Sequence, residues 1–506
     1  MSKYIIAHDF GTTGNKSTLY DEEGNLLHSG FSGYKTIYPH VNWAEQNPYD
    51  WWNAICISTK DLLQKSKINK SEVAVISFSA QMMGCLPLNK KGEPLRNSII
   101  WADQRSVEQA LKLEQELGEE RIYNITGHKI SPTYSLEKIM WLMDNEPDIY
   151  KNTFKFVHAK DYIVSRLTGK FVTDYSDASG MNLFDIIKKK WSPEILKVSK
   201  LDPAKLPEPH CSFDVIGGVS ASVADEIGLK AGTPVVIGTG DGTAASVGAG
   251  VVSEGNAYNY IGSSSWIALA TKKPILDPKR ETFNWVHVDP NMYMPCGTMQ
   301  TAGASYEWLK DNICLMEQKA AEDLDISPFE LMDISVENSV PTSNKLIFLP
   351  YLMGERSPHW NPNARGAFIG LSLKHKRKDI IRSVMEGVTY NLKMISEIFE
   401  NVIDFSDIRV IGGAGSPIWR KIMADIYNKN VLKPKILEEA TSLGAAIVGG
   451  VGVGIFESIE VAEKLNPITE IQKPDPENVK KYESIYPIFK ESYKSLVEIY
   501  DKLSSL

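Results

Sequence analysis

The sequence predicts an α/β protein of two similar domains with an active-site cleft between them. Apolar, β-prone runs alternate with helical patterns along most of the chain. A unit of strand, small polar hairpin and returning strand occurs at residues 4–20 and again at 256–270. Each half later contains a strand that ends in a glycine-rich loop and leads into a helix. This repeated order indicates a diverged duplication.

The first hairpin has the composition of a phosphate-binding turn. Its sequence from Asp9 is DFGTTGNKS, between the apolar run 4–7 and the β-prone run 17–20. Glycines let a phosphate approach the backbone closely, and amides and hydroxyls can cradle it. The Asp9 carboxylate can hold a metal-bound water. A polar turn without a ligand is the competing interpretation, and the similar loops later in the chain favour a binding site.

The next strand pattern, 73–78, runs into the short loop Gln81–Gly84. Helical patterns recur around 105–117 and 135–145. Aromatic rings in this half could stack on a sugar, or could simply belong to the core, as most tryptophans do. The candidates are Trp43, Trp51, Trp52 and Trp101.

Asp241 lies between Gly240 and Gly242, directly after the strand pattern 235–237. A carboxylate there can take a proton from a sugar hydroxyl as a general base, or can form an Asx turn or helix cap. The run also fits Gly-x-Gly-x-x-Ala through Ala245, a dinucleotide-binding pattern. The charge of Asp241 beside a pyrophosphate counts against that pattern, as does the lack of an acidic residue about 20 positions later.

The second half repeats the hairpin as a strand at 256–261, a Gly-Ser-Ser-Ser turn and a return at 266–270. Later the strand 409–411 runs into GGAGSP, and a helix is expected from about 418 to 427. A helix start of this kind can receive an anion or a nucleotide. Arg356 could reach a phosphate or form a structural ion pair. We predict domains at 1–250 and 251–506, with the segment 475–506 as a solvated helical cap.

Composition narrows the function classes. The chain has 506 residues and a net charge of −8 with acids and bases interspersed, which argues against nucleic acid as a partner. No apolar run of about 18 residues predicts a membrane span, and the first residues enter a strand without a signal-peptide pattern. The five scattered cysteines form no CxxC pair and the nine histidines do not cluster. We therefore expect a cytoplasmic protein without disulfides or a zinc site.

The chain resembles the FGGY family of carbohydrate kinases, and within it looks most like the xylulokinases. GAFIGL at 366–371, seven further residues and DIIRSVMEG at 379–387 fit one family signature. A second signature is met by Ser135, by KIMWL from Lys138 and by Asp144-Asn145. The segments WAEQNP from Trp43, FLPYL from Phe348 and GER from Gly354 are also similar.

The resemblance implies a two-domain actin/hexokinase/Hsp70-type fold of ribonuclease H-like domains, with ATP and a small sugar in the cleft. It implies a sugar-binding N-terminal domain and a nucleotide-binding C-terminal domain. D-Xylulose would become D-xylulose 5-phosphate, with Asp241 as general base and Asp9 organising Mg²⁺. The residues implied at ATP are Gly11, Thr12, Thr13, Lys16, Gly262, Ser263, Ser264, Gly303, Gly412, Gly413 and Ala414, and those at the sugar are Gln81, Met82, Met83, Asp241 and Gly242.

Two positions depart from the xylulokinase pattern. Met83 stands where a sugar-contacting histidine is usual, and Gly242 stands where an asparagine follows the catalytic Asp. Both changes remove hydrogen-bonding groups, so the substrate could be another ketose, a polyol or a sugar acid. A nicotinamide-dependent oxidoreductase and a chaperone-type ATPase are the competing functions. The oligomeric state stays open, with a homodimer as one candidate.

Overall fold

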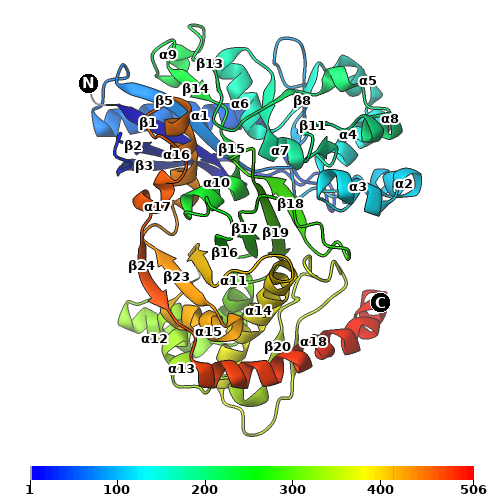
Figure 1. Ribbon diagram of the computed structural model, residues 1–506, viewed down its shortest axis with the longest axis vertical. Helices are drawn as coiled ribbons and strands as arrows, with labels where there is room; N and C mark the ends of the chain where they lie inside the picture. The colour runs from blue at the N-terminus through cyan, green and yellow to red at the C-terminus, as the bar shows by residue number, and fades with distance from the viewer. Residues whose placement is uncertain (1–2, 414, 506) are drawn as a thin grey trace. The chain divides into compact units, whose positions relative to one another are not determined.

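The computed structural model describes residues 3–413 and 415–505. The chain is a mixed α/β protein that divides into two compact units (Figure 1). The first unit contains the residues up to Glu254 together with Ala270–Met294 and Glu439–Pro467. The second unit contains Gly255–Leu269, Pro295–Glu438 and the residues from Ile468 onward. Each unit is built around its own large mixed sheet.

The sheet of the first unit has the strand order β13-β14-β5-β1-β2-β3, with β15 also paired to β5. The predicted hairpin is confirmed as the antiparallel pair β1–β2, and β5 runs parallel to β1. The strands are β1 (Tyr4–Phe10), β2 (Gly14–Tyr20), β3 (Leu26–Gly33), β5 (Val73–Ala80), β13 (Val215–Gly218), β14 (Pro234–Val236) and β15 (Thr239–Gly240).

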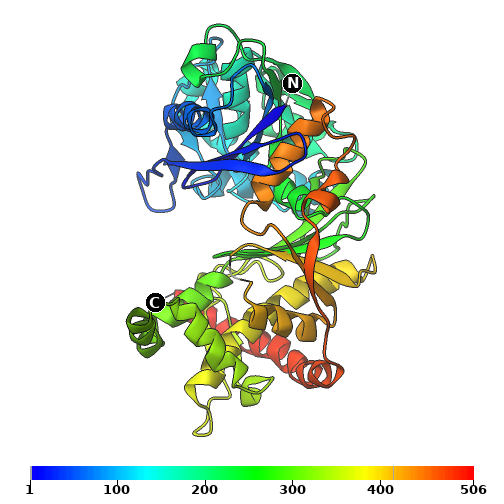
Figure 2. The same ribbon diagram turned by 90° about the vertical axis from the view of Figure 1, so that its left-hand side faces the viewer.

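Two helices cover the two faces of this sheet, as Figure 2 shows. Because side chains alternate along a strand, β1 presents different residues to each helix. His8 Nε2 lies 3.2 Å from the Thr59 hydroxyl of α1 (Pro48–Ser66). Ile5 instead packs beside Gly450 of α16 (Ala440–Gly452). The sheet is therefore buried on both faces.

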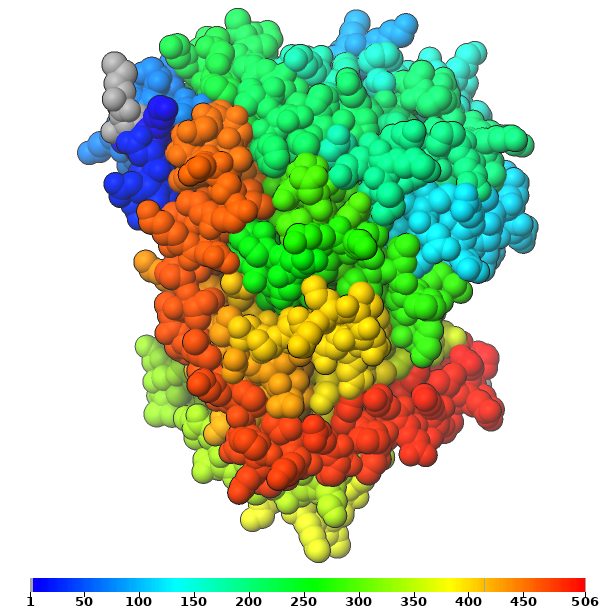
Figure 3. Space-filling view, viewed as in Figure 1, coloured from blue at the N-terminus to red at the C-terminus, as the bar shows by residue number. Residues whose placement is uncertain are grey.

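The helix α16 belongs to the first unit although it lies late in the chain, and Figure 3 shows the orange segment beside the blue N-terminal strands. It packs against α10 (Asp241–Gly248) through glycines. A Cβ at Gly444 would lie 1.9 Å from the carbonyl oxygen of Ala244. The predicted division at residue 250 differs from the compact units at this point, since 270–294 and 439–467 pack with the first unit.

The remaining first-unit elements surround the sheet and form a second core under α4. The helices predicted around 105–117 and 135–145 are confirmed as α2 and α4. The elements are β4 (Glu45–Gln46), β6 (Leu86–Leu88), β7 (Ser98–Ile99), α2 (Val107–Leu117), α3 (Glu119–Thr126), α4 (Ser135–Asn145), α5 (Pro147–Asn152), β8 (Lys155–Val157), α6 (Ala159–Thr168), β9 (Val172–Asp174), α7 (Tyr175–Ser179), β10 (Phe184–Asp185), β11 (Lys190–Trp191), α8 (Pro193–Ser199), β12 (Glu208–His210), α9 (Ala224–Ile227), β18 (Phe283–Val286) and α17 (Val461–Leu465).

Six strands of the second large sheet repeat the main order of the first. The order β24-β23-β22-β16-β17-β19 matches β13-β14-β5-β1-β2-β3, while β18 beyond β19 and β15 beside β5 have no counterpart in the other sheet. The pairs run antiparallel, parallel, parallel, antiparallel and antiparallel in both sheets. This agreement supports the predicted duplication. The strands are β16 (Ala257–Ile261), β17 (Ser265–Leu269), β19 (Tyr293–Met299), β22 (Asp407–Ile411), β23 (Asn430–Pro434) and β24 (Ile468–Gln472).

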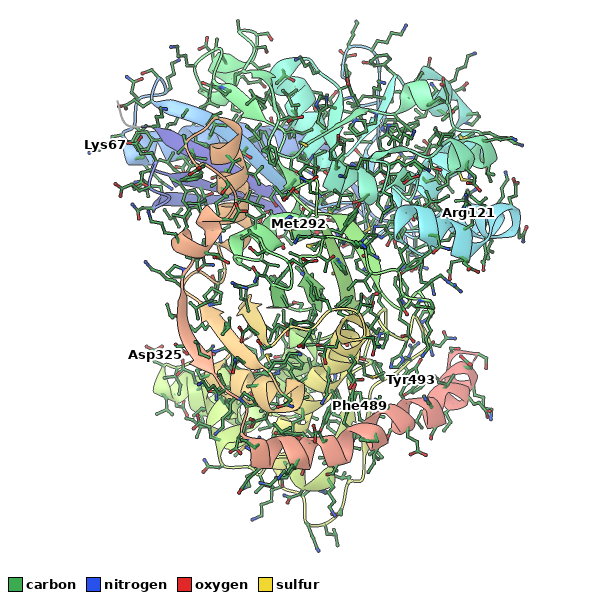
Figure 4. The ribbon with its side chains drawn as sticks, in the orientation of Figure 1. Lys67, Arg121, Met292, Asp325, Phe489 and Tyr493 are labelled. Atoms are coloured by element: carbon green, nitrogen blue, oxygen red, sulfur yellow. The ribbon has the colours of Figure 1, made fainter. Side chains whose placement is uncertain are left out.

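Helices complete the second unit, and the last of them confirms the predicted C-terminal helix, although one of its faces is buried and only the rest is solvated. Phe489 and Tyr493, labelled in Figure 4, lie on a buried face of α18, and the Tyr493 ring stacks on His359 at 3.5 Å. Among the described residues, no helix combines the length and apolar character needed to cross a membrane. The elements are α11 (Gly303–Asn312), α12 (Leu315–Leu324), α13 (Pro328–Glu337), β20 (Ile347–Leu349), β21 (Ala367–Ile369), α14 (Arg377–Glu400), α15 (Pro417–Tyr427) and α18 (Pro476–Ser504).

Candidate active site

Three neighbouring parallel strands of the first unit end at the same edge, and polar residues lie at their ends. Asp9 of β1 is level with Ser79 of β5, and Ser79 is level with Thr239 of β15. Asp241 follows β15 directly as the first residue of α10. The fold therefore brings together two carboxylates that the sequence separates by more than two hundred positions.

Asp9 is only partly buried and has a defined partner. Its Oδ1 accepts a hydrogen bond of 2.8 Å from Ser79 Oγ. Burial raises the pKa of Asp9, while the Ser79 hydrogen bond and the charge of Lys16 oppose that rise. A pocket of about 630 Å³ opens beside it, lined by Gly11, Thr13 and Gly14 of the hairpin among others.

The surroundings of Asp9 fit the Mg²⁺ that the sequence implied. Mg²⁺ keeps several waters and usually takes one or two protein carboxylates plus phosphate oxygens. A single carboxylate that faces an open pocket beside a glycine-rich turn meets that requirement. When bound there, the ion would neutralise charge on the phosphates.

The hairpin is tied to the residues behind it by a polar network. The Thr12 hydroxyl accepts a hydrogen bond of 2.9 Å from Trp101 Nε1, and its carbonyl accepts one of 2.7 Å from Gln46 Nε2. Gln46 Oε1 in turn receives Trp51 Nε1 and Gln81 Nε2 at 3.0 and 2.7 Å. Gln81 Oε1 is buried and has no hydrogen-bond partner in the described structure.

Asp241 has the surroundings of a general base. Its Oδ1 accepts a hydrogen bond of 2.7 Å from the Gly242 amide, and the residue is exposed to solvent. Surrounding protein atoms strip the carboxylate of hydration, and this effect, followed by the negative charge of Asp9, raises the pKa of Asp241 to about 7. A carboxylate with a pKa near neutrality can accept a proton far better than an ordinary aspartate.

The two methionines of the predicted sugar loop differ in their packing. Met82 is buried and packs against Gly240. A Cβ added to Gly240 would lie only 2.4 Å from Met82 Sδ. This contact also fills the space beside the first glycine of the predicted dinucleotide pattern. Met83 has a backbone φ of 62°, a conformation uncommon for non-glycine residues. Its carbonyl is held by Lys138 Nζ at 2.8 Å.

Lys138 and Lys16 are both engaged within the first unit. Lys138 is buried, and its ammonium donates to the carbonyls of Met83, Ile100 and Thr133. Lys16, predicted at the nucleotide, pairs with Glu439 at 3.0 Å, with each side chain about 30% exposed.

A second pocket lies wholly within the second unit and has a volume of about 540 Å³. It brings together four of the predicted nucleotide residues: Gly262, Ser263, Gly303 and Gly413. The start of α11 closes onto the hairpin, since the Gly303 amide donates to the Gly262 carbonyl at 2.9 Å. The pocket is therefore built on backbone groups at one end.

Gly412 has a structural rather than a lining position. Its φ is +94°, and a Cβ there would lie 2.4 Å from the Ile261 carbonyl oxygen, so the loop packs on the hairpin only with glycine. Neither Gly412 nor Ser264 is among the residues that line the pocket. Ala414 lies outside the described residues.

The other end of this pocket consists of residues that the sequence analysis missed. Tyr306 and Phe329 stack with ring centroids 5.6 Å apart, and the Tyr306 hydroxyl donates to Asp333 at 3.0 Å. Burial raises the pKa of Asp333. Phe329 follows a Ser-Pro helix start, but no local pattern links that helix to the glycine loops.

The five remaining sequence candidates are four tryptophans and Arg356. Trp51 and Trp52 are core residues at 1% and 2% exposure, whereas Trp101 is 37% exposed beside the hairpin. The Arg105 guanidinium stacks on Trp43 at 3.7 Å. The guanidinium of Arg356 lies over the Trp360 ring at 5.4 Å.

Comparison with known proteins identifies the same architecture. Residues 4–248 match the N-terminal domain of the FGGY family of carbohydrate kinases, and residues 257–453 match its C-terminal domain. The chain is 31% identical to a gluconokinase of Bacillus licheniformis over 100% of this chain and 98% of the relative. It is 33% identical to a xylulose kinase of Lactococcus lactis over 99% and 98%. A ligand-bound xylulose kinase structure from Lactobacillus acidophilus superposes with a TM-score of 0.92 at 28% identity, covering 99% of this chain and all of that one.

Proposed function

The chain belongs to the FGGY family of carbohydrate kinases and is thus an ATP-dependent sugar kinase, and we propose that it phosphorylates a small neutral ketose, with D-xylulose as the first candidate. The observation that carries this proposal is the pair of carboxylates at the strand ends of the first unit. Asp241 has a pKa of about 7 there, and Asp9 faces a pocket lined by the glycine-rich hairpin.

In this mechanism Asp241 accepts the proton of the sugar hydroxyl while that oxygen attacks the γ-phosphorus of ATP. The new O–P bond forms as the bond to the β,γ-bridging oxygen breaks, and ADP leaves with that oxygen. Alignment and charge stabilisation supply most of the rate in phosphoryl transfer. Gln81 Oε1, buried and unpartnered, supports a role in orienting a sugar hydroxyl.

The charges near Asp241 favour a neutral substrate over a sugar acid. Asp9 and Asp241 both place negative charge at the strand ends. Lys138 is saturated by three carbonyls, and Arg105 is paired with Asp103 and Glu45 at 2.7 and 2.8 Å. Only Nη1 of Arg105 has no hydrogen-bond partner among the described residues. A carboxylate on the substrate would be repelled by the two acids, and of these two cations only Arg105, through Nη1, has a donor left to offset that repulsion.

The pocket of the second unit supports the nucleotide assignment. Gly262, Gly303 and Gly413 line one end of this pocket, and residues without a side chain let a phosphate approach the backbone closely. The aromatic pair Tyr306 and Phe329 offers an apolar wall for a base. Asp333 lies beside that pair and can accept hydrogen bonds from the nucleoside.

A coupled ADP-release screen tests the proposal. The panel contains D-xylulose, other pentuloses and hexuloses, polyols and D-gluconate, each at equal concentration with ATP and Mg²⁺. We expect the highest kcat/KM with a neutral ketose. A preference for D-gluconate would overturn the neutral-substrate proposal. Comparison of D-gluconate with D-glucitol, the uncharged polyol of the same carbon skeleton, would show whether the charge of the substrate decides. NAD(H) in place of ATP should give no turnover.

A further inference from the structure

Behind Asp241 lies a buried ionic cluster centred on Lys160. The Lys160 ammonium is 2.8 Å from Asp161, 3.1 Å from Asp174 and 3.1 Å from Asp177. All four side chains are 0% exposed. His158, Asp161 and Asp177 could by themselves resemble a metal site, but the ammonium already supplies the positive charge that these carboxylates require.

One arm of the cluster leads to the backbone immediately before Asp241. Asp174 caps α7, and its Oδ2 accepts the Ser176 hydroxyl at 2.6 Å and the Ser212 hydroxyl at 2.8 Å. Ser176 Oγ then accepts the Gly240 amide at 2.9 Å. The chain from Lys160 through Asp174 and Ser176 thus ends at the residue that precedes Asp241.

The other arm leads to the loop that carries Gln81 and Met83. Asp161 lies 3.3 Å from His158 Nδ1, and His158 Nε2 lies 3.1 Å from Ser135 Oγ. The Ser135 hydroxyl donates to the Gly84 carbonyl at 2.7 Å. Because the Ser135 hydroxyl already donates its proton to the Gly84 carbonyl, it accepts the hydrogen bond from the imidazole. His158 therefore carries a proton on Nε2.

We propose that the Lys160 cluster is a positioning device for the sugar site, which holds Asp241 through Asp174 and Ser176 and holds the loop Gln81–Gly84 through Asp161, His158 and Ser135. This inference rests on the proposed role of Asp241 as base. None of these cluster residues needs to touch the substrate, so each acts as a positioning residue.

Stability alone does not account for the cluster. A buried ion pair or triad often contributes no more than apolar residues of similar volume would, because the charges lose their hydration. Directed hydrogen bonds, in contrast, fix the orientation of what they contact. Here both ends of the network are backbone groups beside proposed sugar-site residues, and a displacement of about 1 Å at a reacting group can cost about a hundredfold in rate.

The first test removes the Asp241 arm. Ser176→Ala should lower kcat by about 10²-fold and leave the KM values for sugar and ATP within about twofold, since positioning of the base fails while binding persists. Ser179→Ala is the matched control: it is buried on the same helix, and its hydroxyl donates to the Ser176 carbonyl without reaching Gly240. The control should keep its kcat.

The second test removes the loop arm. Ser135→Ala should raise the KM for the sugar by about tenfold, which corresponds to the loss of one hydrogen bond. The kcat and the KM for ATP should stay nearly unchanged. A merely structural role would lower kcat and thermal stability and raise both KM values together in all three variants. That pattern would overturn the proposal.

Folding and the role of Asp241 are separated by two further variants. If Ser176→Ala does not fold, Ser212→Ala, which removes only one bond to Asp174, should still lower kcat several-fold; an unchanged kcat would overturn the proposal. Asp241→Asn distinguishes the assignment of Asp241 as base from the positioning role of the cluster. If it keeps full turnover, the base assignment itself is wrong. If it is inactive while Ser176→Ala retains its kcat, the positioning inference alone is wrong.

Discussion

The hairpins that open the two sheets have the same topology but different side chains. The β1–β2 hairpin carries Asp9 and Lys16 at directly opposed positions and binds Trp101 through Thr12. The β16–β17 hairpin carries no charged residue between Ala257 and Leu269. Its order comes from the Tyr260–Trp266 stack at 4.0 Å and from amides of α11 that donate to its carbonyls.

This difference separates two ways of handling phosphate. The second hairpin offers backbone groups, which recognise an anion without charge of their own. The first hairpin offers a carboxylate, which suits a metal ion and accepts protons. Of the two hairpins, only the first therefore carries charged side chains, and the predictions below test that division.

The largest effect is expected from Asp241→Asn. Loss of the base should lower kcat by roughly 10²–10⁴-fold, while ATP binding persists because the pocket of the second unit is untouched. Asp289→Asn, an aspartate of the same unit on a turn, should keep full activity. Steady-state kinetics with nucleotide titration checks both. More than about half of the original rate in Asp241→Asn would show that this carboxylate is not the base.

The second prediction sets the two hairpins directly against each other. Asp9→Ala should lower kcat by about a hundredfold and raise the Mg²⁺ concentration needed for half-maximal rate, because the carboxylate is proposed to hold the ion's waters. Ser263→Ala in the second hairpin should change the rate less than about threefold, since its backbone groups remain. A normal magnesium titration in Asp9→Ala would make Asp9 structural.

These contrasts show what the sequence could reveal. The hairpins and the strand–glycine–helix units follow from local periodicity and from glycines that only certain turns require. The return of α16 to the first unit does not, because an apolar helix rich in glycine fits either sheet, and the choice depends on Ala244 facing Gly444. The local sequence pattern also could not predict that Tyr306 contacts Phe329, because these rings meet only when α11 and α13 pack together.

The third prediction concerns sugar choice, which we assign to the first unit. Met83→His with Gly242→Asn should raise kcat/KM for D-xylulose relative to the native substrate by roughly ten- to a hundredfold. Gly242 has room, since a Cβ would meet only Met294 at an ordinary 3.5 Å. Histidine is also more frequent than methionine at a positive φ such as that of residue 83.

Met83 could instead fill a gap behind the sugar, because it is only 9% exposed. Met140→Leu, a buried methionine of α4, controls for loss of packing and should leave the sugar ratios unchanged. An unaltered ratio in the double variant, with its thermal transition intact, would exclude these two positions from substrate recognition.

The fourth prediction is a pH dependence. The raised pKa of Asp241, about 7, means that the base is half protonated near neutrality. Only the carboxylate accepts a proton, so kcat should rise through pH 7 and fall about tenfold per pH unit below pH 6. A flat profile between pH 5.5 and 8 would contradict the assignment. Ser263→Ala should show the same profile, because the second hairpin carries no titrating group.

The smallest effect is expected at Lys16. Its pair with Glu439 is about one-third exposed on both sides, and such pairs contribute less than about 1 kcal/mol. Glu439→Gln should therefore leave the thermal midpoint nearly unchanged. It also releases the Lys16 ammonium toward the pocket that Lys16 lines with Asp9, so the KM for ATP should fall by about two- to threefold. Lys16→Met should raise it. Both variants could instead lose equal, small amounts of stability without any change in the KM for ATP. That result would show that Lys16 only links β2 to the start of α16. Asp9 would then be the only charged residue of the first hairpin that acts in catalysis.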